Sequence, residues 1–315
     1  MKMENMKIRN YQETDLPELA SFFTLYLEKY PDAKLNSPEF YTYHPLLKGK
    51  DNTFCMVDAD QKILGFAPMF PVLITDGPAA QLNDIWTIIL ACPDHKQAEA
   101  IHEILFARVC ERVDEFKSEY HAHQIRLASD MMVSQKADID YLLGKGFKPF
   151  ERMFVMNRDT SQGIPSISMP DGVVLRQSKL ESEEEQSAYL KVYNASFPQN
   201  QKSVEDLKFL LHSPIWETGC ALCAYSASNE LIGSILVYPD GQNNAGIVDD
   251  VMVLPAWQGR KIAKYLVGEG LCYLRTQNLP EARLEVRASN IPAVSVYEAM
   301  GYKKVNEEYL LEKML

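Results

Sequence analysis

The sequence predicts an α/β fold with a mixed sheet, built twice in tandem along 315 residues. Three observations carry this prediction. The two halves repeat the same order of apolar runs, a segment rich in serine, glycine and proline separates them, and the second half contains a strand that leads through a short turn into a long helix. We therefore expect domains at residues 1–158 and 172–315, joined by a linker at 159–171.

The halves correspond element by element: a strand, helical segments, a hairpin, a strand ending in proline, a long helix, a strand, a short helix, a Gly-aromatic turn and a final strand. The hairpins share their spacing, with Gly65 and Pro71 in the first half and Gly233 and Pro239 in the second. Other paired positions are Ile8-Arg9 and Leu175-Arg176, Pro93 and Pro255, 124–128 and 282–286, and Gly146-Phe147 and Gly301-Tyr302.

The strand, turn and helix of the second half predict an anion site. Residues 251–254 are apolar and include the β-branched Val251 and Val253, and Pro255 ends the strand. Apolar residues then recur at helical spacing, at Ile262, Tyr265, Leu266, Leu271 and Leu274. A turn that opens a helix presents free N–H groups at the positive end of the helix dipole, which suits a phosphate. An ordinary joint with solvated basic residues fits this window equally well.

Composition narrows the functional classes. The formal net charge of −11 gives no support to a nucleic-acid role. No apolar run approaches the roughly 20 residues of a membrane span, and no signal-peptide core follows Met1, so we expect a cytoplasmic protein. We also expect a monomer or a homodimer. The six cysteines are scattered, and the C-x-x-C pair Cys220 and Cys223 falls in a predicted strand, so we predict reduced thiols and no metal.

Two motifs of the second half resemble those of the GNAT superfamily of acyl-CoA-dependent N-acyltransferases, whose element order fits residues 173–315. The first resembles the family's pyrophosphate-binding pattern and consists of Gln258, Gly259, Arg260, Lys261, Ile262 and Ala263, with Lys261 where the family has a glycine. The second resembles the family's Asn-to-aromatic run and consists of Asn290, Ala293, Tyr297, Gly301 and Tyr302. The resemblance implies acetyl-CoA as the acyl donor and two tandem GNAT-like domains.

The resemblance also assigns the cofactor contacts. A backbone N–H of Met252 or Val253 binds the thioester carbonyl, the turn from Gln258 to Ala263 binds the pyrophosphate, and Asn290 contacts the pantetheine arm or the neighbourhood of Tyr297. Asn290 also suits the N-cap of the following helix, and the two roles are compatible.

Two side chains are candidates for proton transfer. Tyr297 is the candidate acid for the leaving thiolate, because the ordinary pKa of tyrosine, about 10, exceeds that of a thiol, about 8.5. A helical aromatic packed on the sheet is its structural alternative. Asp249 is the candidate base, through a water molecule, and a solvated Asp249-Asp250 pair is the alternative. Because neighbouring strand residues point to opposite faces, we expect only one of the two carboxylates to face the amine.

The first half lacks these features. Counted from the prolines, Glu99 falls where Lys261 falls, and Leu142 falls at the position of Tyr297. In GNAT proteins the acceptor is selected largely by the first two helices, here about 189–216. We therefore expect an acetyltransferase with one C-terminal site, in which a primary amine of a small molecule or peptide attacks directly in a ternary complex. The alternative is an inactive acyl-CoA-binding or protein-interaction module. No Gly-x-Gly-x-x-Gly or P-loop supports a nucleotide-binding fold.

Overall fold

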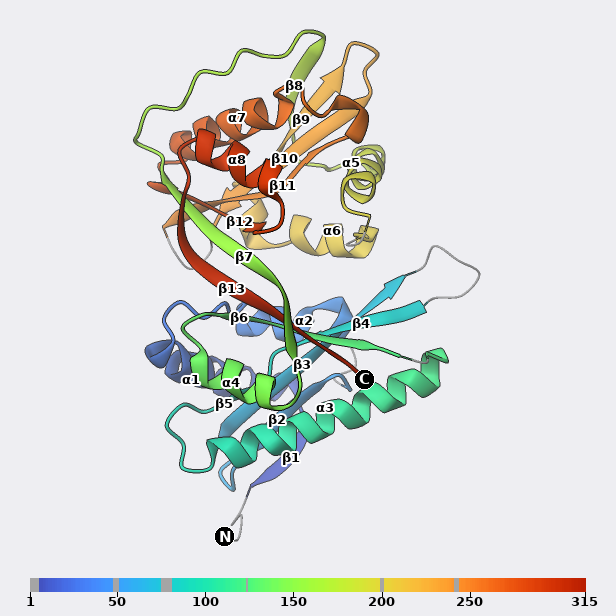
Figure 1. The fold of residues 1–315 in the computed structure, drawn as a ribbon, viewed down its shortest axis with the longest axis vertical. Helices are drawn as coiled ribbons and strands as arrows, with labels where there is room; N and C mark the ends of the chain where they lie inside the picture. Colours follow the sequence, from blue (N-terminus) through green and yellow to red (C-terminus); the bar gives the residue numbers. More distant parts are fainter. Residues whose placement is uncertain (1–5, 48–50, 75–80, 123, 199–200, 241–243) are drawn as a thin grey trace. The chain divides into compact units, whose positions relative to one another are not determined.

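The computed structural model describes residues 6–47, 51–74, 81–122, 124–198, 201–240 and 244–315. The chain forms two compact α/β units (Figure 1). The N-terminal unit comprises Met1–Arg152 and Glu308–Leu315, and the C-terminal unit comprises Met153–Glu307. The predicted mixed α/β architecture is confirmed in both.

The strands of the N-terminal unit follow the order β1-β2-β3-β4-β6-β13, and β5 pairs with β3. Neighbours are antiparallel, except that β4 runs parallel to β6. The strands are β1 (Lys7–Asn10), β2 (Thr53–Val57), β3 (Ile63–Ile74), β4 (Gln81–Thr87), β5 (Leu90–Ala91), β6 (Arg126–Met132) and β13 (Lys303–Met314).

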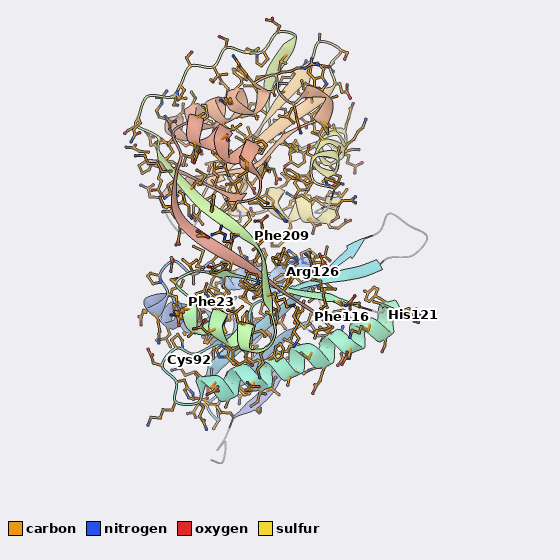
Figure 2. The ribbon with its side chains drawn as sticks, in the orientation of Figure 1. Phe23, Cys92, Phe116, His121, Arg126 and Phe209 are labelled. Atoms are coloured by element: carbon orange, nitrogen blue, oxygen red, sulfur yellow. The ribbon has the colours of Figure 1, made fainter. Side chains whose placement is uncertain are left out.

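The helices of this unit cover two separate cores. An aromatic core that includes Phe23, labelled in Figure 2, lies beneath the first two helices. Phe23 packs edge-on against Tyr41 and Phe66. An aliphatic core lies beneath the long α3, whose residues Ile101, Leu105 and Val109 are fully buried. The helices are α1 (Leu16–Lys29), α2 (Pro38–Tyr43), α3 (Ala98–Tyr120) and α4 (Lys136–Gly144), with 3-10 turns at Glu13–Asp15 and Pro45–Leu47.

The strands of the C-terminal unit follow the order β7-β12-β11-β10-β9-β8, antiparallel except for the parallel pair β11 and β12. They are β7 (Lys148–Asp159), β8 (Val173–Ser178), β9 (Cys220–Ser226), β10 (Leu231–Pro239), β11 (Ala245–Val253) and β12 (Glu281–Arg287). The helices are α5 (Glu183–Ser196), α6 (Val204–Leu211), α7 (Ile262–Thr276) and α8 (Ile291–Ala299), with 3-10 turns at Pro214–Trp216 and Pro255–Trp257.

The two faces of this sheet carry different helices. One face packs against α7 and α8, and the other packs against α5 and α6 (Figure 1). Alternate residues of β11 supply the two cores: Val253 joins the α7 side and Met252 joins the α5 side. The helix predicted from Ile262 is present as α7, and its periodic apolar residues are buried.

Two long strands distinguish the compact units from the expected domains. Residues 153–159 of β7 pair with β12 in the C-terminal unit, and residues 308–314 of β13 pair with β6 in the N-terminal unit. Each unit thus includes a strand that follows, in sequence, the elements of the other unit. The domain boundaries 1–158 and 172–315, with a linker at 159–171, remain a proposal.

The six cysteines are free thiols, and Cys220 and Cys223 are buried in β9. Among the described residues, no helix is long and apolar enough to cross a membrane.

Candidate active site

The strands β11 and β12 separate after a short stretch of pairing. The pairs Ala245 with Glu281, Gly246 with Ala282, and Ile247 with Arg283 are parallel neighbours, after which β11 continues to Val253 and β12 to Arg287. Within the described stretch, the facing edges beyond these pairs do not bond to each other. Backbone groups of β11 are therefore available to a ligand that enters between the strands.

The hydrogen-bonding pattern identifies which residue of β11 faces this open edge. Leu254 donates its N–H to Ile232 O at 2.8 Å, and Met252 lies opposite Ser234. In an antiparallel ladder, alternate residues bond to the same neighbour, so Met252 directs its N–H and C=O toward β10. Val253 directs its own groups to the open edge, where Gln258 Nε2 donates to Val253 O at 3.1 Å.

A bulge in β11 brings both aspartates to one face. Ser234 of β10 lies opposite Met252, and Leu236 lies opposite Asp249. One residue of β10 lies between these pairs but two of β11 do, so β11 contains one extra residue. Asp250 has a φ of 45°, which is uncommon outside glycine. Asp249 accepts a hydrogen bond from Tyr238 Oη at 2.8 Å, and Asp250 accepts one from Tyr189 Oη at 2.5 Å.

Both tyrosines pack in the core beneath α5 and α6. The two carboxylates therefore do not point to opposite faces of the strand as expected, because strict alternation fails at the bulge. Which of them faces the amine stays a prediction. Burial, and next the neighbouring charge of Asp249, raise the pKa of Asp250 to about 6.

The turn before α7 has the backbone of a glycine-rich turn although only one glycine is present. Gly259 has a φ of 76°, and Lys261, the N-cap residue of α7, has φ 65° and ψ 8°. Lys261 thus adopts the left-handed conformation that suits the glycine it replaces, and its side chain is exposed. Arg260 lies with its guanidinium carbon 4.6 Å from the centre of the Trp257 ring.

The first N–H groups of α7, at Ile262 and Ala263, have no partner within their own helix. The turn therefore provides backbone donors, two exposed basic side chains and the positive end of a helix dipole in one place, which fits a pyrophosphate.

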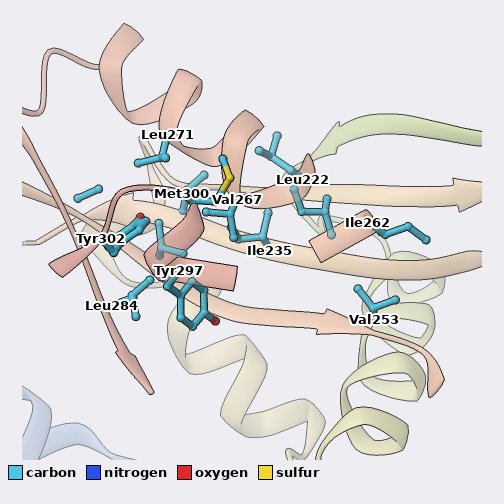
Figure 3. Close-up of a cluster of buried hydrophobic side chains, with 14 of the residues drawn as sticks. Leu222, Ile235, Val253, Ile262, Val267, Leu271, Leu284, Tyr297, Met300 and Tyr302 are labelled. Atoms are coloured by element: carbon cyan, nitrogen blue, oxygen red, sulfur yellow. The ribbon is translucent and has the colours of Figure 1, made fainter. Parts of the chain in front are cut away.

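Tyr297 lies on α8 at the margin of the core that α7 and α8 share. Its ring is 7 % exposed, and Figure 3 shows its hydroxyl pointing away from the aliphatic side chains of the cluster. Burial is the main cause that raises the pKa of Tyr297 above 10, and the charge of Asp249 adds to it. The hydroxyl is therefore protonated at neutral pH.

Asn290 is exposed and caps α8, where its Oδ1 accepts from Ala293 N at 3.3 Å. The capping role expected from the sequence is present, and an outward-facing first turn of α8 remains available to a ligand.

Comparison with known proteins shows what this unit is similar to. Residues 187–302 match the model of the acetyltransferase (GNAT) family. The C-terminal half of the chain is thus similar to the GNAT acetyltransferase family. Mycothiol acetyltransferase of Renibacterium salmoninarum is 29% identical over 154 residues, covering 46% of this chain and 45% of the relative. That of Nocardioides sp. is 29% identical over 181 residues, covering 52% and 61%.

The chain thus spans about half the length of the curated relatives it matches. Solved structures match along its whole length. A tandem GNAT protein from the clavulanic acid biosynthesis pathway has a TM-score of 0.70 at 12% identity. This match covers 98% of each chain. A GCN5-related N-acetyltransferase from Sphaerobacter thermophilus has a TM-score of 0.70 at 17% identity, with 100% of this chain and 97% of that one covered. These similarities show a tandem GNAT fold.

The C-terminal unit, called here the GNAT unit for its similarity to that family, contains on the side of α5 and α6 groups that the sequence motifs did not indicate. Lys202, before α6, places Nζ 2.5 Å from Asp250 Oδ2, and a groove between α5 and α6 of about 580 Å³ is lined by Lys202, Asn194 and Leu190 among others. Lys202 was missed because it lies in a loop without a motif. Tyr189 was expected only as part of the segment 189–216 that selects the acceptor.

Proposed function

We propose that the GNAT unit transfers an acetyl group from acetyl-CoA to a primary amine of a small molecule or peptide. The observation that carries this proposal is the open edge of β11, which ends directly at the phosphate-binding type of turn before α7. A ligand with an acyl thioester at one end and a pyrophosphate at the other matches the order of these two features along the chain.

In this proposal different residues bind different parts of acetyl-CoA. The turn from Gln258 to Ala263 holds the pyrophosphate through backbone N–H groups, with Arg260 and Lys261 adding positive charge. The N–H of Val253 donates to the carbonyl oxygen, where negative charge develops as the amine attacks, and Met252, whose groups point to β10, acts through packing alone. Asn290 orients the first turn of α8 beside the pantetheine arm.

Proton transfer requires a base for the ammonium and an acid for the thiolate. The Asp249 carboxylate accepts the amine proton through a water molecule, while its hydrogen bond from Tyr238 fixes its orientation. As the C–S bond breaks, the Tyr297 hydroxyl gives its proton to the sulfur. The acetyl group ends on the amine nitrogen, and free CoA leaves.

A second candidate function is an acyl-CoA-binding module without catalysis. Lys261 supports it, because the side chain adds bulk where the family has glycine. The relatives named mycothiol acetyltransferase favour catalysis, and from them we carry over acetyl transfer alone.

Incubation of the full chain with acetyl-CoA and a panel of primary amines, followed by mass spectrometry of the products, separates the two. The enzyme hypothesis predicts an amide product with at least one amine and a rate that saturates with acetyl-CoA. Binding of acetyl-CoA without an amide product from any amine, at any protein concentration, would favour the binding module.

A further inference from the structure

Lys202 is held in place at both its backbone and its side chain. Its N–H donates to Asn194 Oδ1 at 2.9 Å, and Asn194 Nδ2 donates back to Lys202 O at 3.3 Å. The loop before α6 is thereby fastened to α5. The Lys202 side chain extends from this clamp toward β11 and is 20% exposed.

The ammonium of Lys202 lies in a site made of a carboxylate and an aromatic ring. Nζ is 2.5 Å from Asp250 Oδ2 and 4.4 Å from the centre of the Tyr193 ring. The same carboxylate oxygen accepts from Tyr189 Oη, and the Asp250 side chain is only 9% exposed. A carboxylate together with the face of an aromatic ring is a recognition site for an alkylammonium ion.

This site lies near the open edge of β11, where the proposed function places the thioester. Asp250 lies in the bulge of β11, and Val253, whose N–H faces the open edge, follows three residues later. At about 3.3 Å per residue the two are separated by on the order of 10 Å, less the shortening at the bulge. A lysine has a flexible four-carbon stem, so rotation of the Lys202 side chain moves Nζ over a comparable range.

The charges of the site favour a cation in this position. Asp249 and Asp250 are adjacent and on one face, and the Lys202 ammonium pairs with Asp250. An external acceptor ammonium would make the contacts that Lys202 makes, so the two compete for one position. Lys202 also lines the groove between α5 and α6, together with Asn194 and Leu190.

We propose that Lys202 is a tethered acceptor, and that in the absence of an external amine its Nζ is acetylated by the GNAT unit. The proposal rests on the acetyl transfer proposed above. The Lys202 ammonium loses one proton to the Asp250 carboxylate or to water, and its nitrogen attacks the thioester carbon. A C–N bond forms, the C–S bond breaks, and the departing sulfur takes a proton from Tyr297, which gives acetyl-Lys202 and free CoA.

The modification would change the acceptor site. An acetylated nitrogen has no charge and cannot pair with Asp250, so the carboxylate becomes available to an external ammonium. Self-acetylation is thus a single event for each chain, after which the groove is lined by an amide in place of a cation.

The test is peptide-resolved mass spectrometry of the full chain during incubation with acetyl-CoA and no added amine. Lys191, which is exposed on α5, reports the non-enzymatic reaction of a surface lysine. We expect acetylation of Lys202 to be at least 10-fold faster than that of Lys191 and to approach one group per chain. In Tyr297→Phe, the Lys202 reaction slows at least 10-fold while that of Lys191 does not change.

Two further variants test whether the fast acetylation occurs on Lys202 itself. Lys202→Arg retains the cation and should remove the fast acetylation entirely, while Lys191→Arg should leave it intact. Thermal melting verifies that each variant is folded. Acetylation of Lys202 no faster than that of Lys191, in a chain that acetylates an added amine, would overturn this inference and leave the proposed function standing. Failure to bind acetyl-CoA at all, measured by titration calorimetry, would overturn both.

Discussion

The two units have the same strand order, but they differ at the start of one short helix. This helix is α4, after β6, in the N-terminal unit and α8, after β12, in the C-terminal unit. In the C-terminal unit, α8 begins with exposed residues: Asn290 and Pro292 face solvent, and Ile291 is 63% exposed. In the N-terminal unit, the corresponding start of α4 is closed. Gln135 and Asp138, at and after its N-cap, are each 4% exposed.

A polar cluster closes the N-terminal unit at this point. Tyr26 of α1 donates to Asp138, and Gln135 Nε2 donates to Tyr26 Oη at 2.8 Å. His102 of α3 places Nε2 3.2 Å from the other oxygen of Asp138 and stacks on Tyr141. Buried hydrogen bonds thus join α1 to the start of α4, and the His102–Asp138 contact brings α3 to the same place, where the GNAT unit has an accessible helix start.

The turns before the long helices α7 and α3 also differ, in backbone conformation and in charge. Lys261 caps α7 with a left-handed backbone, whereas α3 begins at Ala98 without such a residue and carries Glu99 in its first turn. The comparison teaches that one fold supports two outcomes. Polar groups at the helix starts either satisfy one another inside the unit or remain open to a ligand. The predictions below test this division.

Replacing the proposed acid should have the largest effect. Tyr297→Phe removes the hydroxyl and keeps the ring, so we expect kcat to fall by about 10²- to 10³-fold while the Kd of acetyl-CoA changes less than twofold. Steady-state kinetics and titration calorimetry measure the two quantities. Tyr141→Phe, next to the position in the N-terminal unit that corresponds to Tyr297, is the matched control and should leave kcat unchanged. Equal turnover in both variants would remove Tyr297 from the mechanism.

Breaking the polar cluster of the N-terminal unit should affect stability alone. Asp138→Ala leaves the Tyr26 hydroxyl and the His102 ring without their shared partner, so the free energy of unfolding should fall by about 2 to 3 kcal/mol. Chemical denaturation measures this loss. The Kd of acetyl-CoA should not change, and a shift in that Kd of tenfold or more would show that this cluster serves the cofactor site.

The free energy of unfolding should depend on pH through the carboxyl group of Asp250. Because the pKa of folded Asp250, about 6, lies above the usual 3.8, the folded protein holds this proton more tightly than the unfolded chain. Its contribution is fully present below about pH 4 and is lost as the pH rises through about 6. Relative to Asp250→Asn, the wild type should therefore gain about 1 to 3 kcal/mol of unfolding free energy as the pH falls from 7 to 4. A difference independent of pH would contradict the raised pKa.

The smallest effect concerns the backbone of the turn. Lys261→Gly removes a side chain from a left-handed conformation that costs about 1 kcal/mol, and the greater freedom of glycine in the unfolded chain offsets part of this. We expect thermal unfolding to show a stabilisation of up to about 1 kcal/mol. Destabilisation by more than about 1 kcal/mol would mean that the Lys261 side chain makes a contact that the turn requires.

Periodicity and repeats predicted the fold because the apolar residues of α7 and of the paired hairpins follow helical and strand spacing closely. The turn from Gln258 to Ala263 could be located because it lies between two such elements. The bulge at Asp250 could not be predicted, since it inserts one residue without a glycine to mark it. Lys202 and the cluster of Tyr26, His102 and Asp138 depend on contacts between residues distant in sequence, which no local pattern records.

The central claim is that the chain has one acetyl-CoA site, at the turn before α7. Titration calorimetry of the full chain with acetyl-CoA tests it most directly, with Arg260→Glu/Lys261→Glu alongside. Arg275→Glu/Lys303→Glu, two exposed positions away from the turn, provides the same change in charge. We predict one molecule bound per chain, binding lost in the first variant and retained in the second. Two molecules per chain, or binding that survives the first variant, would contradict the account.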